Sequence, residues 1–207
     1  MKVLFDFDDV IFNSQGFKNF MFQVLKDKGC ANLESLYKET RKNGRPFSLH
    51  DFIHEANNTF TSEVQEEIYQ QIIGISEHCI NQEVFGIMKR LGKQNCYIVT
   101  SGEPRFQMDK IKRSIGSDVA QEVLVVGASK AEVIQNLCRK HMDEEIIFVD
   151  NNTDFFNDID MIQCKNLKTV LFNENGIGNL EAELQESIHN EELKQTKAPQ
   201  NRPMGLR

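Results

Sequence analysis

The chain has 207 residues with a formal net charge of −7, and 40 % of the residues are hydrophobic while 27 % are charged. This composition is typical of a soluble globular protein with one core domain and an insertion, or with two small domains. The acidic balance and the lack of a long basic run argue against nucleic acid as a main partner. No stretch of the sequence has the length and apolar character of a membrane span.

The cysteines and the N-terminal residues indicate the cytoplasm. The five cysteines are far apart, odd in number and free of C-x-x-C spacing, which is typical of reduced thiols in a cytosolic protein. The first residues predict a strand that contains aspartates, and they do not resemble a signal peptide. We therefore expect a cytoplasmic protein. Its oligomeric state is not indicated by the sequence.

A strand buried on both faces opens the predicted fold. Residues 3–5 and Phe7 are apolar without a helical period, as in the strands of parallel sheets. Asp6 and Asp8 lie at the carboxyl end of this run and, being two apart, point the same way. Two neighbouring carboxylates repel and are costly to bury, and a divalent cation removes that cost. The pattern predicts a metal-assisted pair of acid and nucleophile; alternatively, the aspartates only end the strand and start a turn.

Residues 14–80 have the spacing of four short amphipathic helices. Apolar side chains recur three and four residues apart in the segments 17–25, 33–40, 49–56 and 64–79. Ser62 and Gln65 have the spacing of a capping box at the start of the last segment. We expect residues 14–80 to form an all-helical cap domain inserted after the first strand.

A basic turn interrupts this helical segment. Arg41, Lys42 and Arg45 flank it, and they are placed to close over a site at the end of the first strand. A solvated basic loop is the simpler interpretation.

From about residue 82 strands and helices alternate. Strands are predicted at residues 96–99, 123–126, 146–149 and 169–172, and helices at 84–91, 104–115 and 130–138. This alternation is typical of an α/β fold with a parallel sheet and right-handed crossovers, a Rossmann-like doubly wound core. The core comprises residues 1–13 and 81–175. Residues 176–207 are predicted to hold a C-terminal helix, at 179–193, and a disordered tail, at 195–207.

Polar residues follow the predicted strands, where parallel sheets bind ligands. Thr100 offers a hydroxyl, and Ser101 and Gly102 offer backbone N–H groups near a helix start, which together predict a phosphate cradle. A capped turn is the alternative. Lys130 lies at the start of the next helix, where its charge needs a nearby anion, although a solvated lysine is the simpler interpretation.

The fourth predicted strand ends in a second group of acids. Asp150 is placed to reach a metal, and Asp154 is placed to support either Asp150 or Lys130. The alternative for Asp154 or Thr153 is a helix N-cap.

The four groups together resemble the haloacid dehalogenase superfamily, in particular its phosphatase-type members. That pattern has Asp-x-Asp after the first strand, Thr or Ser after the second, Lys near the next helix and paired acids after the fourth strand. This sequence supplies, in that order, Asp6 and Asp8, Thr100, Lys130, and Asp150 and Asp154. The resemblance covers about residues 1–172, with the helical cap inserted after the first motif.

The resemblance implies an Mg²⁺-dependent hydrolase of small phosphate monoesters. Asp6 is the implied nucleophile, which becomes an aspartyl phosphate, and Asp8 is the implied acid and base. Thr100 and Lys130 neutralise the phosphoryl oxygens. The implied magnesium ligands are the Asp6 carboxylate, the Asp8 backbone carbonyl and Asp150. A phosphotransferase or sugar-phosphate mutase, and a non-catalytic phosphate-binding module on the same fold, remain alternatives.

The sequence departs from this pattern at two positions. Asp9 stands where many relatives have Gly, and Asn151 stands where an acid is common. The second acid of the last motif must then be Asp154. The presence of Asp8 argues against a true dehalogenase, whose reaction has no leaving-group oxygen to protonate.

Overall fold

The computed structural model describes residues 1–42, 46–116, 118–127, 129–173 and 175–197. Its centre is a five-stranded, wholly parallel sheet in the order β3-β2-β1-β4-β5. The strands are β1 (Lys2–Phe5), β2 (Cys96–Ser101), β3 (Glu122–Val126), β4 (Ile146–Asp150) and β5 (Leu167–Leu171). The chain winds outward from β1 to β3 and returns to β4 on the other side of β1. This reversal creates the crevice at the carboxyl ends of β1 and β4 where such sheets bind ligands.

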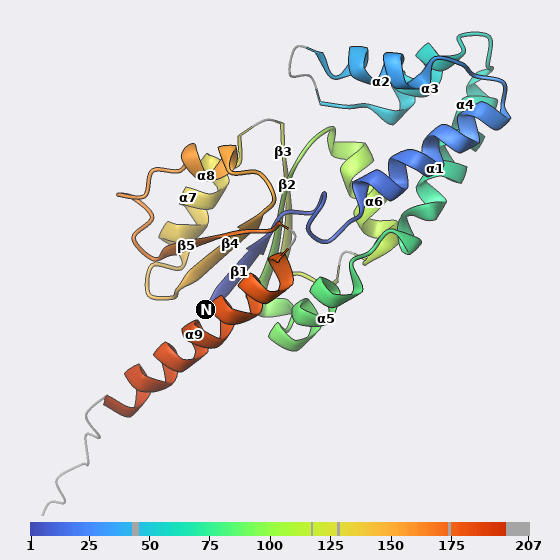
Figure 1. Ribbon diagram of the computed structural model, residues 1–207. Coiled ribbons are helices and arrows are strands. Elements are labelled where there is room, and N and C mark those ends of the chain that lie inside the picture. Colours follow the sequence, from blue (N-terminus) through green and yellow to red (C-terminus); the bar gives the residue numbers. More distant parts are fainter. Residues whose placement is uncertain (43–45, 117, 128, 174, 198–207) are drawn as a thin grey trace, which may run out of the picture.

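Helices cover both faces of the sheet. A separate group of helices is formed by the part of the chain that connects β1 to β2. They are α1 (Ser14–Asp27), α2 (Leu33–Thr40), α3 (Leu49–Ala56), α4 (Ser62–Gly74), η2 (Ile75–His78), α5 (Gln82–Leu91), η3 (Lys93–Asn95), α6 (Pro104–Ser114), α7 (Ala131–Lys140), α8 (Asp154–Asn157) and α9 (Gly176–Lys197). In Figure 1, α1–α4 lie beyond the sheet, whereas α9 runs away from the sheet on the opposite side. None of the helices in the described part of the chain combines the length and apolar character that a membrane crossing needs.

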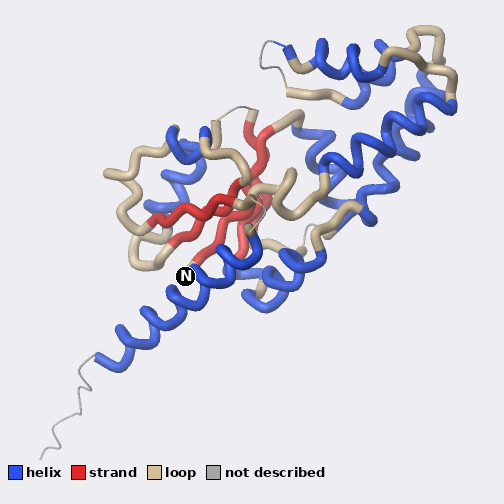
Figure 2. Tube along the Cα trace, in the orientation of Figure 1, coloured by secondary structure: helices blue, strands red, loops and turns tan. Residues whose placement is uncertain are grey.

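The alternation of side chains along β1 builds two cores. Val3 and Phe5 belong to a core that includes α5, α6 and α9 and continues into α1–α4, while Leu4 belongs to a second core on the other face, with α7 and α8. Both faces are buried, which explains the unbroken apolar run of this strand. The architecture confirms the predicted α/β, doubly wound parallel sheet, and Figure 2 shows the strands gathered into one layer between helices.

The two connections between α1–α4 and the sheet run side by side. The Asn13 N–H donates to the Cys79 carbonyl at 2.7 Å, and the Asn81 N–H donates to the Ile11 carbonyl at 2.8 Å. Every strand of the sheet in the described ranges lies outside residues 14–80. The helical segment is thus attached through one short, hydrogen-bonded pair of chain segments.

Three local predictions were wrong. The N-cap of α4 is Thr61 rather than Ser62, because the Thr61 hydroxyl accepts from the Val64 N–H at 3.4 Å. The last strand begins and ends earlier than 169–172, and helix α9 is longer than 179–193 and contains residues 195–197 of the predicted tail. The rest of that tail lies outside the described residues. All five cysteines are free and buried.

Candidate active site

Three buried charged residues meet at the carboxyl ends of β1 and β4. The Lys130 Nζ lies 2.8 Å from Asp6 Oδ1 and 2.6 Å from Asp150 Oδ2. The exposed fractions of the Lys130 and Asp150 side chains are 1 % and 0 %, and that of Asp6 is 8 %. Burial raises the pKa of Asp6 to about 7. The attraction of Lys130 lowers this pKa, and the repulsion of Asp150 raises it further. Two carboxylates therefore share one ammonium group in a nearly dry site.

This cluster has the donor chemistry of a magnesium site. Within the described ranges, no three His, Cys, Asp or Glu side chains are grouped so as to hold a metal by themselves. Magnesium does not need three, since it is usually held by one or two carboxylates, with water and substrate oxygens as its other ligands. Asp6 and Asp150 supply two carboxylates and Lys130 balances only one of them. The oxygen donors and the remaining negative charge thus fit a divalent cation.

Thr100 is buried at the end of β2 with an unused hydroxyl. The residue is 1 % exposed, and its Oγ1 has no hydrogen-bond partner in the described structure. A buried hydroxyl without a partner is costly, by about 1–3 kcal/mol. Such a group is expected where a ligand completes its hydrogen bonding.

The backbone N–H of Gly102, which the sequence assigns to a phosphate cradle, already has a partner in this conformation. This N–H donates to the Val126 carbonyl at 2.9 Å, so it is not available to a phosphate oxygen in this conformation. The φ of Gly102 is +153°, and a Cβ at this position would lie only 2.6 Å from Gln107 Nε2, which explains the need for glycine. Gly102 allows Gln107 to approach the strand end, and Ser101 contributes its carbonyl, which accepts from Gln107 Nε2 at 2.8 Å.

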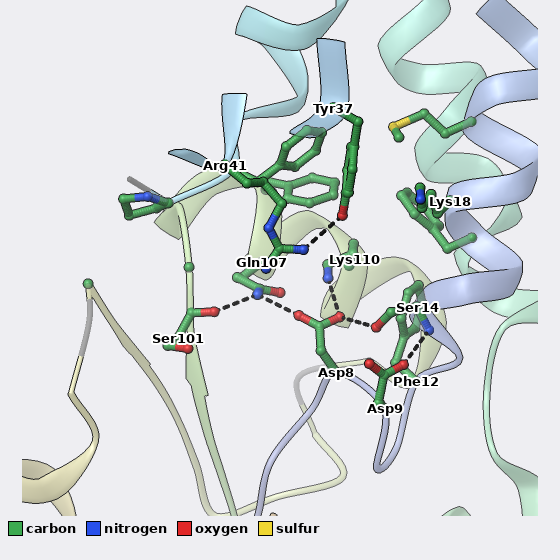
Figure 3. Close-up of a pocket in the computed structure, with 17 residues that line it drawn as sticks. Asp8, Asp9, Phe12, Ser14, Lys18, Tyr37, Arg41, Ser101, Gln107 and Lys110 are labelled. Carbon is green, nitrogen blue, oxygen red and sulfur yellow. Dashed lines mark hydrogen bonds and ion pairs between the residues drawn. The ribbon is translucent and has the colours of Figure 1, made fainter. Parts of the chain in front are cut away.

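Asp8 lies in a second polar cluster with Lys110, Gln107 and Ser14 (Figure 3). Its Oδ1 accepts from Lys110 Nζ at 2.6 Å and from the Ser14 hydroxyl at 2.9 Å, and its Oδ2 accepts from Gln107 Nε2 at 2.7 Å. Burial raises the pKa of Asp8, but Lys110, helped by the other hydrogen bonds, outweighs burial and holds that pKa below its usual value. Asp8 is therefore a carboxylate in this conformation, the state that a general base requires.

Sequence reasoning missed Lys110 and Gln107. Both are buried on α6, at 3 % and 4 % exposure, next to the apolar Phe106 and Ile111. Lys110 Nζ also lies over three aromatic rings, those of Phe7, Phe12 and Phe106, at 4.8–5.3 Å from their centroids. Polar residues on the buried stripe of an amphipathic helix were the available signal.

We expect Lys110→Met to destabilise the protein. Methionine keeps contact with the rings but leaves the Asp8 carboxylate without its cation. Removing one partner of a buried pair typically costs 3–5 kcal/mol, and because 31 % of the Asp8 side chain is exposed we expect about 2–3 kcal/mol. Urea denaturation measures the change. Lys112→Met, at an exposed position of the same helix, is the control; equal stability of the two variants would contradict the assigned ion pair.

A cavity of about 370 Å³ opens above Asp8, between the helical segment and the sheet. Its floor includes Asp8, Ser101 and Gly102, and its far side includes Arg41 and Tyr37. Asp6, Thr100, Lys130 and Asp150 are buried and do not line the cavity. Of the basic turn, Arg41 lines the cavity, Lys42 is exposed and pairs with Glu39, and Arg45 lies outside the described residues.

The structure explains why an aspartate is tolerated at position 9, and it shows the surroundings of Asp154. Asp9 has a φ of +59°, a conformation that favours Gly but that Asp tolerates, and its Oδ1 accepts from the Ser14 N–H. Asp154 is exposed, and its carboxylate has no hydrogen-bond or ion-pair partner in the described ranges. It supports neither Asp150 nor Lys130. Instead, the Asn152 N–H donates to Asp150 Oδ1 at 2.8 Å.

The chain matches no protein-family model and no curated protein sequence. Solved structures are nevertheless similar to it. A haloacid dehalogenase-like hydrolase from Burkholderia xenovorans LB400 aligns with a TM-score of 0.63 at 16 % identity, over 84 % of this chain and 86 % of that one. The magnesium-bound HAD-hydrolase YfnB from Bacillus subtilis aligns with a TM-score of 0.51 at 16 % identity, over 83 % and 86 %. A dehalogenase with an intermediate complex aligns with a TM-score of 0.53 at 11 % identity, over 84 % and 85 %. At these identities the similarity establishes a shared fold.

Proposed function

From the premise that this chain has the haloacid dehalogenase-like fold, we propose that it is an Mg²⁺-dependent hydrolase of small phosphate monoesters. The observation that carries the proposal is the buried cluster in which Asp6 and Asp150 share Lys130 as their one cationic partner among the described residues. The two carboxylates lie at the ends of neighbouring parallel strands, and Lys130 neutralises only part of their negative charge. A divalent cation would neutralise the rest and would bind a phosphoryl oxygen at the same place. The unpartnered Thr100 hydroxyl supports the proposal, because it offers a hydrogen bond to a phosphoryl oxygen. The buried, free thiols agree with a cytoplasmic location.

In the proposed first step, a carboxylate oxygen of Asp6 attacks phosphorus. The new bond joins Asp6 to phosphorus, and the bond from phosphorus to the alcohol oxygen breaks. Asp8 in its protonated form, which the second step regenerates when Asp8 takes a proton from water, gives a proton to that oxygen. Lys130 and Thr100 hold the phosphoryl oxygens, and such positioning and charge neutralisation supply most of the catalysis in phosphoryl transfer.

In the second step, Asp8 removes a proton from water, which attacks the phosphorus of the aspartyl phosphate. The bond from Asp6 to phosphorus breaks, and inorganic phosphate leaves. The ionised state of Asp8, held by Lys110, suits this step directly. Asp6, Asp150 and the Asp8 carbonyl would hold Mg²⁺, which supplies charge neutralisation and positioning for the phosphoryl oxygens.

We expect phosphate release to require Mg²⁺ and Asp150. Excess chelator should stop it, and Asp150→Ala should reduce it to the background because the metal loses a buried carboxylate ligand. A phosphate-release assay over a metabolite panel measures both effects. Asp154→Ala, an exposed carboxylate nearby in the sequence, is the matched control and should keep its activity. Full activity in chelator, or equal losses in the two variants, would argue against the magnesium site.

We also propose that residues 14–80 act as a movable cap on the core formed by residues 1–13 and 81–175. Phosphate must reach Asp6, which is buried and does not line the cavity, and cap movement would provide access and then exclude water. The paired connections at Asn13 and Asn81 suit a hinge. We expect the radius of gyration from small-angle scattering to fall when Mg²⁺ and orthovanadate are added. Identical scattering curves would speak against a moving cap.

A further inference from the structure

We propose that the alcohol part of the substrate is a flat aromatic ring that carries a second anionic group, which Arg41 binds. The inference rests on the proposed function, since it assigns the phosphoryl end of the substrate to the side of the cavity that Asp8 lines. Three features of the described structure carry it: a continuous aromatic wall, a cation without a carboxylate partner, and the placement of that cation at the end of the cavity opposite Asp8.

The aromatic wall leads from the floor of the cavity to its far side. Successive ring centroids are 5.4 Å apart for Phe12 and Phe17, 5.9 Å for Phe17 and Phe106, 5.6 Å for Phe106 and Phe47, and 5.2 Å for Phe47 and Tyr37. All five rings line the cavity. Aromatic faces and edges gain most from another ring at such distances. A flat ring is therefore favoured over a flexible or branched chain of similar volume.

Arg41 is the cation of the cavity whose charge is still available. Among the described residues, Lys110 is paired with Asp8 and Lys18 is paired with Glu34 at 3.3 Å. The Arg41 guanidinium instead donates to the Tyr37 hydroxyl at 2.9 Å and lies 5.6 Å from the centroid of the Tyr37 ring. The described residues offer it no carboxylate within ion-pair distance. Its remaining N–H groups can bind a carboxylate or a second phosphate in two-point fashion.

The geometry separates the two ends of the proposed substrate. Figure 3 shows Arg41 and Tyr37 on one side of the cavity and Asp8 on the other. The volume of about 370 Å³ is at the small end of the range for ligand sites, which suits a substrate with one ring. An anion at Arg41 would also be kept away from Asp8 and Asp9, which line the opposite side and repel it.

Three esters test the inference: benzyl phosphate, para-carboxybenzyl phosphate and cyclohexylmethyl phosphate. The methylene group separates the substituent from the leaving oxygen, so the chemistry of the leaving group changes little. We expect kcat/KM to be highest for para-carboxybenzyl phosphate, about tenfold above benzyl phosphate. A hydrogen bond between charged groups strengthens binding by about tenfold or more, and an exposed one such as that to Arg41 lies at the lower end of this range. Benzyl phosphate should in turn exceed cyclohexylmethyl phosphate.

The ratio of kcat/KM between the two benzyl esters is the decisive readout, because damage to folding cancels in it. Arg41→Gln should reduce this ratio to about one. Lys42→Gln removes the neighbouring cation, which is exposed and paired with Glu39, and should leave the ratio unchanged. Titration calorimetry of the two esters with Asp6→Asn measures the same preference without turnover.

Each outcome decides between the two levels of the proposal. Turnover of all three esters at similar kcat/KM, or a ratio unaffected by Arg41→Gln, overturns the inference but leaves the phosphatase proposal intact. Binding to Asp6→Asn that depends on Arg41, without turnover by the unmodified protein, supports the binding site at Arg41 but contradicts its use for a hydrolysed ester, and the metabolite panel tests the phosphatase proposal separately. If these esters are neither bound nor turned over, the inference is overturned. The metabolite panel then tests the phosphatase proposal by itself.

Discussion

Asp6→Asn should lose turnover of every phosphate monoester that the unmodified protein hydrolyses. An amide nitrogen or oxygen does not replace the carboxylate as a nucleophile, so the covalent intermediate cannot form. Loss of a nucleophile can cost about 10⁶-fold in kcat, which places the variant at the background of a phosphate-release assay. The loss should be the same for good and poor leaving groups, since both must first be attacked by Asp6.

The stability of Asp6→Asn provides its control. Asp6 is buried, and Asp150 repels its charge. Removing that charge while keeping the side-chain volume leaves Lys130 paired with Asp150 at 2.6 Å. We therefore expect a melting temperature equal to or above that of the unmodified protein. Retained turnover in a well-folded variant would show that Asp6 is not the nucleophile.

Asp8→Asn should affect substrates according to their leaving group. An alkyl phosphate leaves poorly without a proton, and help from a general acid typically contributes about 10²–10⁴-fold, so its first step should collapse. A nitrophenyl phosphate leaves readily, and its first step should be affected much less. The second step still lacks the base that activates water. Rapid-quench kinetics should therefore show a burst of nitrophenol followed by a stall.

Lys110 makes this experiment more informative. In the present conformation its ammonium group holds Asp8 in the carboxylate form, which suits the second step better than the first. A large burst with slow release would indicate that the base role of Asp8 dominates. Equal losses for the alkyl and nitrophenyl esters, without a burst, would exclude Asp8 as both acid and base.

The fold could be predicted well because its signals are local. The apolar run at residues 3–5 and the regular alternation after residue 82 reflect burial on both faces of parallel strands. Element ends were less predictable. The N-cap of α4 moved by one residue because Thr61 and Ser62 are chemically equivalent caps, and only the backbone conformation selects between them.

The site was predictable where its residues follow strands directly, and not where helices bring distant residues to it. Asp6, Lys130 and Asp150 meet as the order of strands requires. Lys110 reaches Asp8 across 102 positions in the sequence because α6 packs against the loop after β1. Asp154 is exposed in this conformation, and the spacing of the motif does not show which way a side chain in a short helix points. The sequence also does not show that the Gly102 N–H donates to the Val126 carbonyl of the neighbouring strand in this conformation.

The most direct test of the central claim is the location of the phosphoryl group on the protein. Asp8→Asn is mixed with nitrophenyl phosphate and Mg²⁺, quenched in acid during the stall, and examined by intact mass and by peptide mapping. We expect one added phosphoryl group, on the peptide that contains Asp6, and its absence when chelator replaces Mg²⁺. A burst of nitrophenol without added mass, or a phosphoryl group on any residue other than Asp6, would contradict the proposed mechanism.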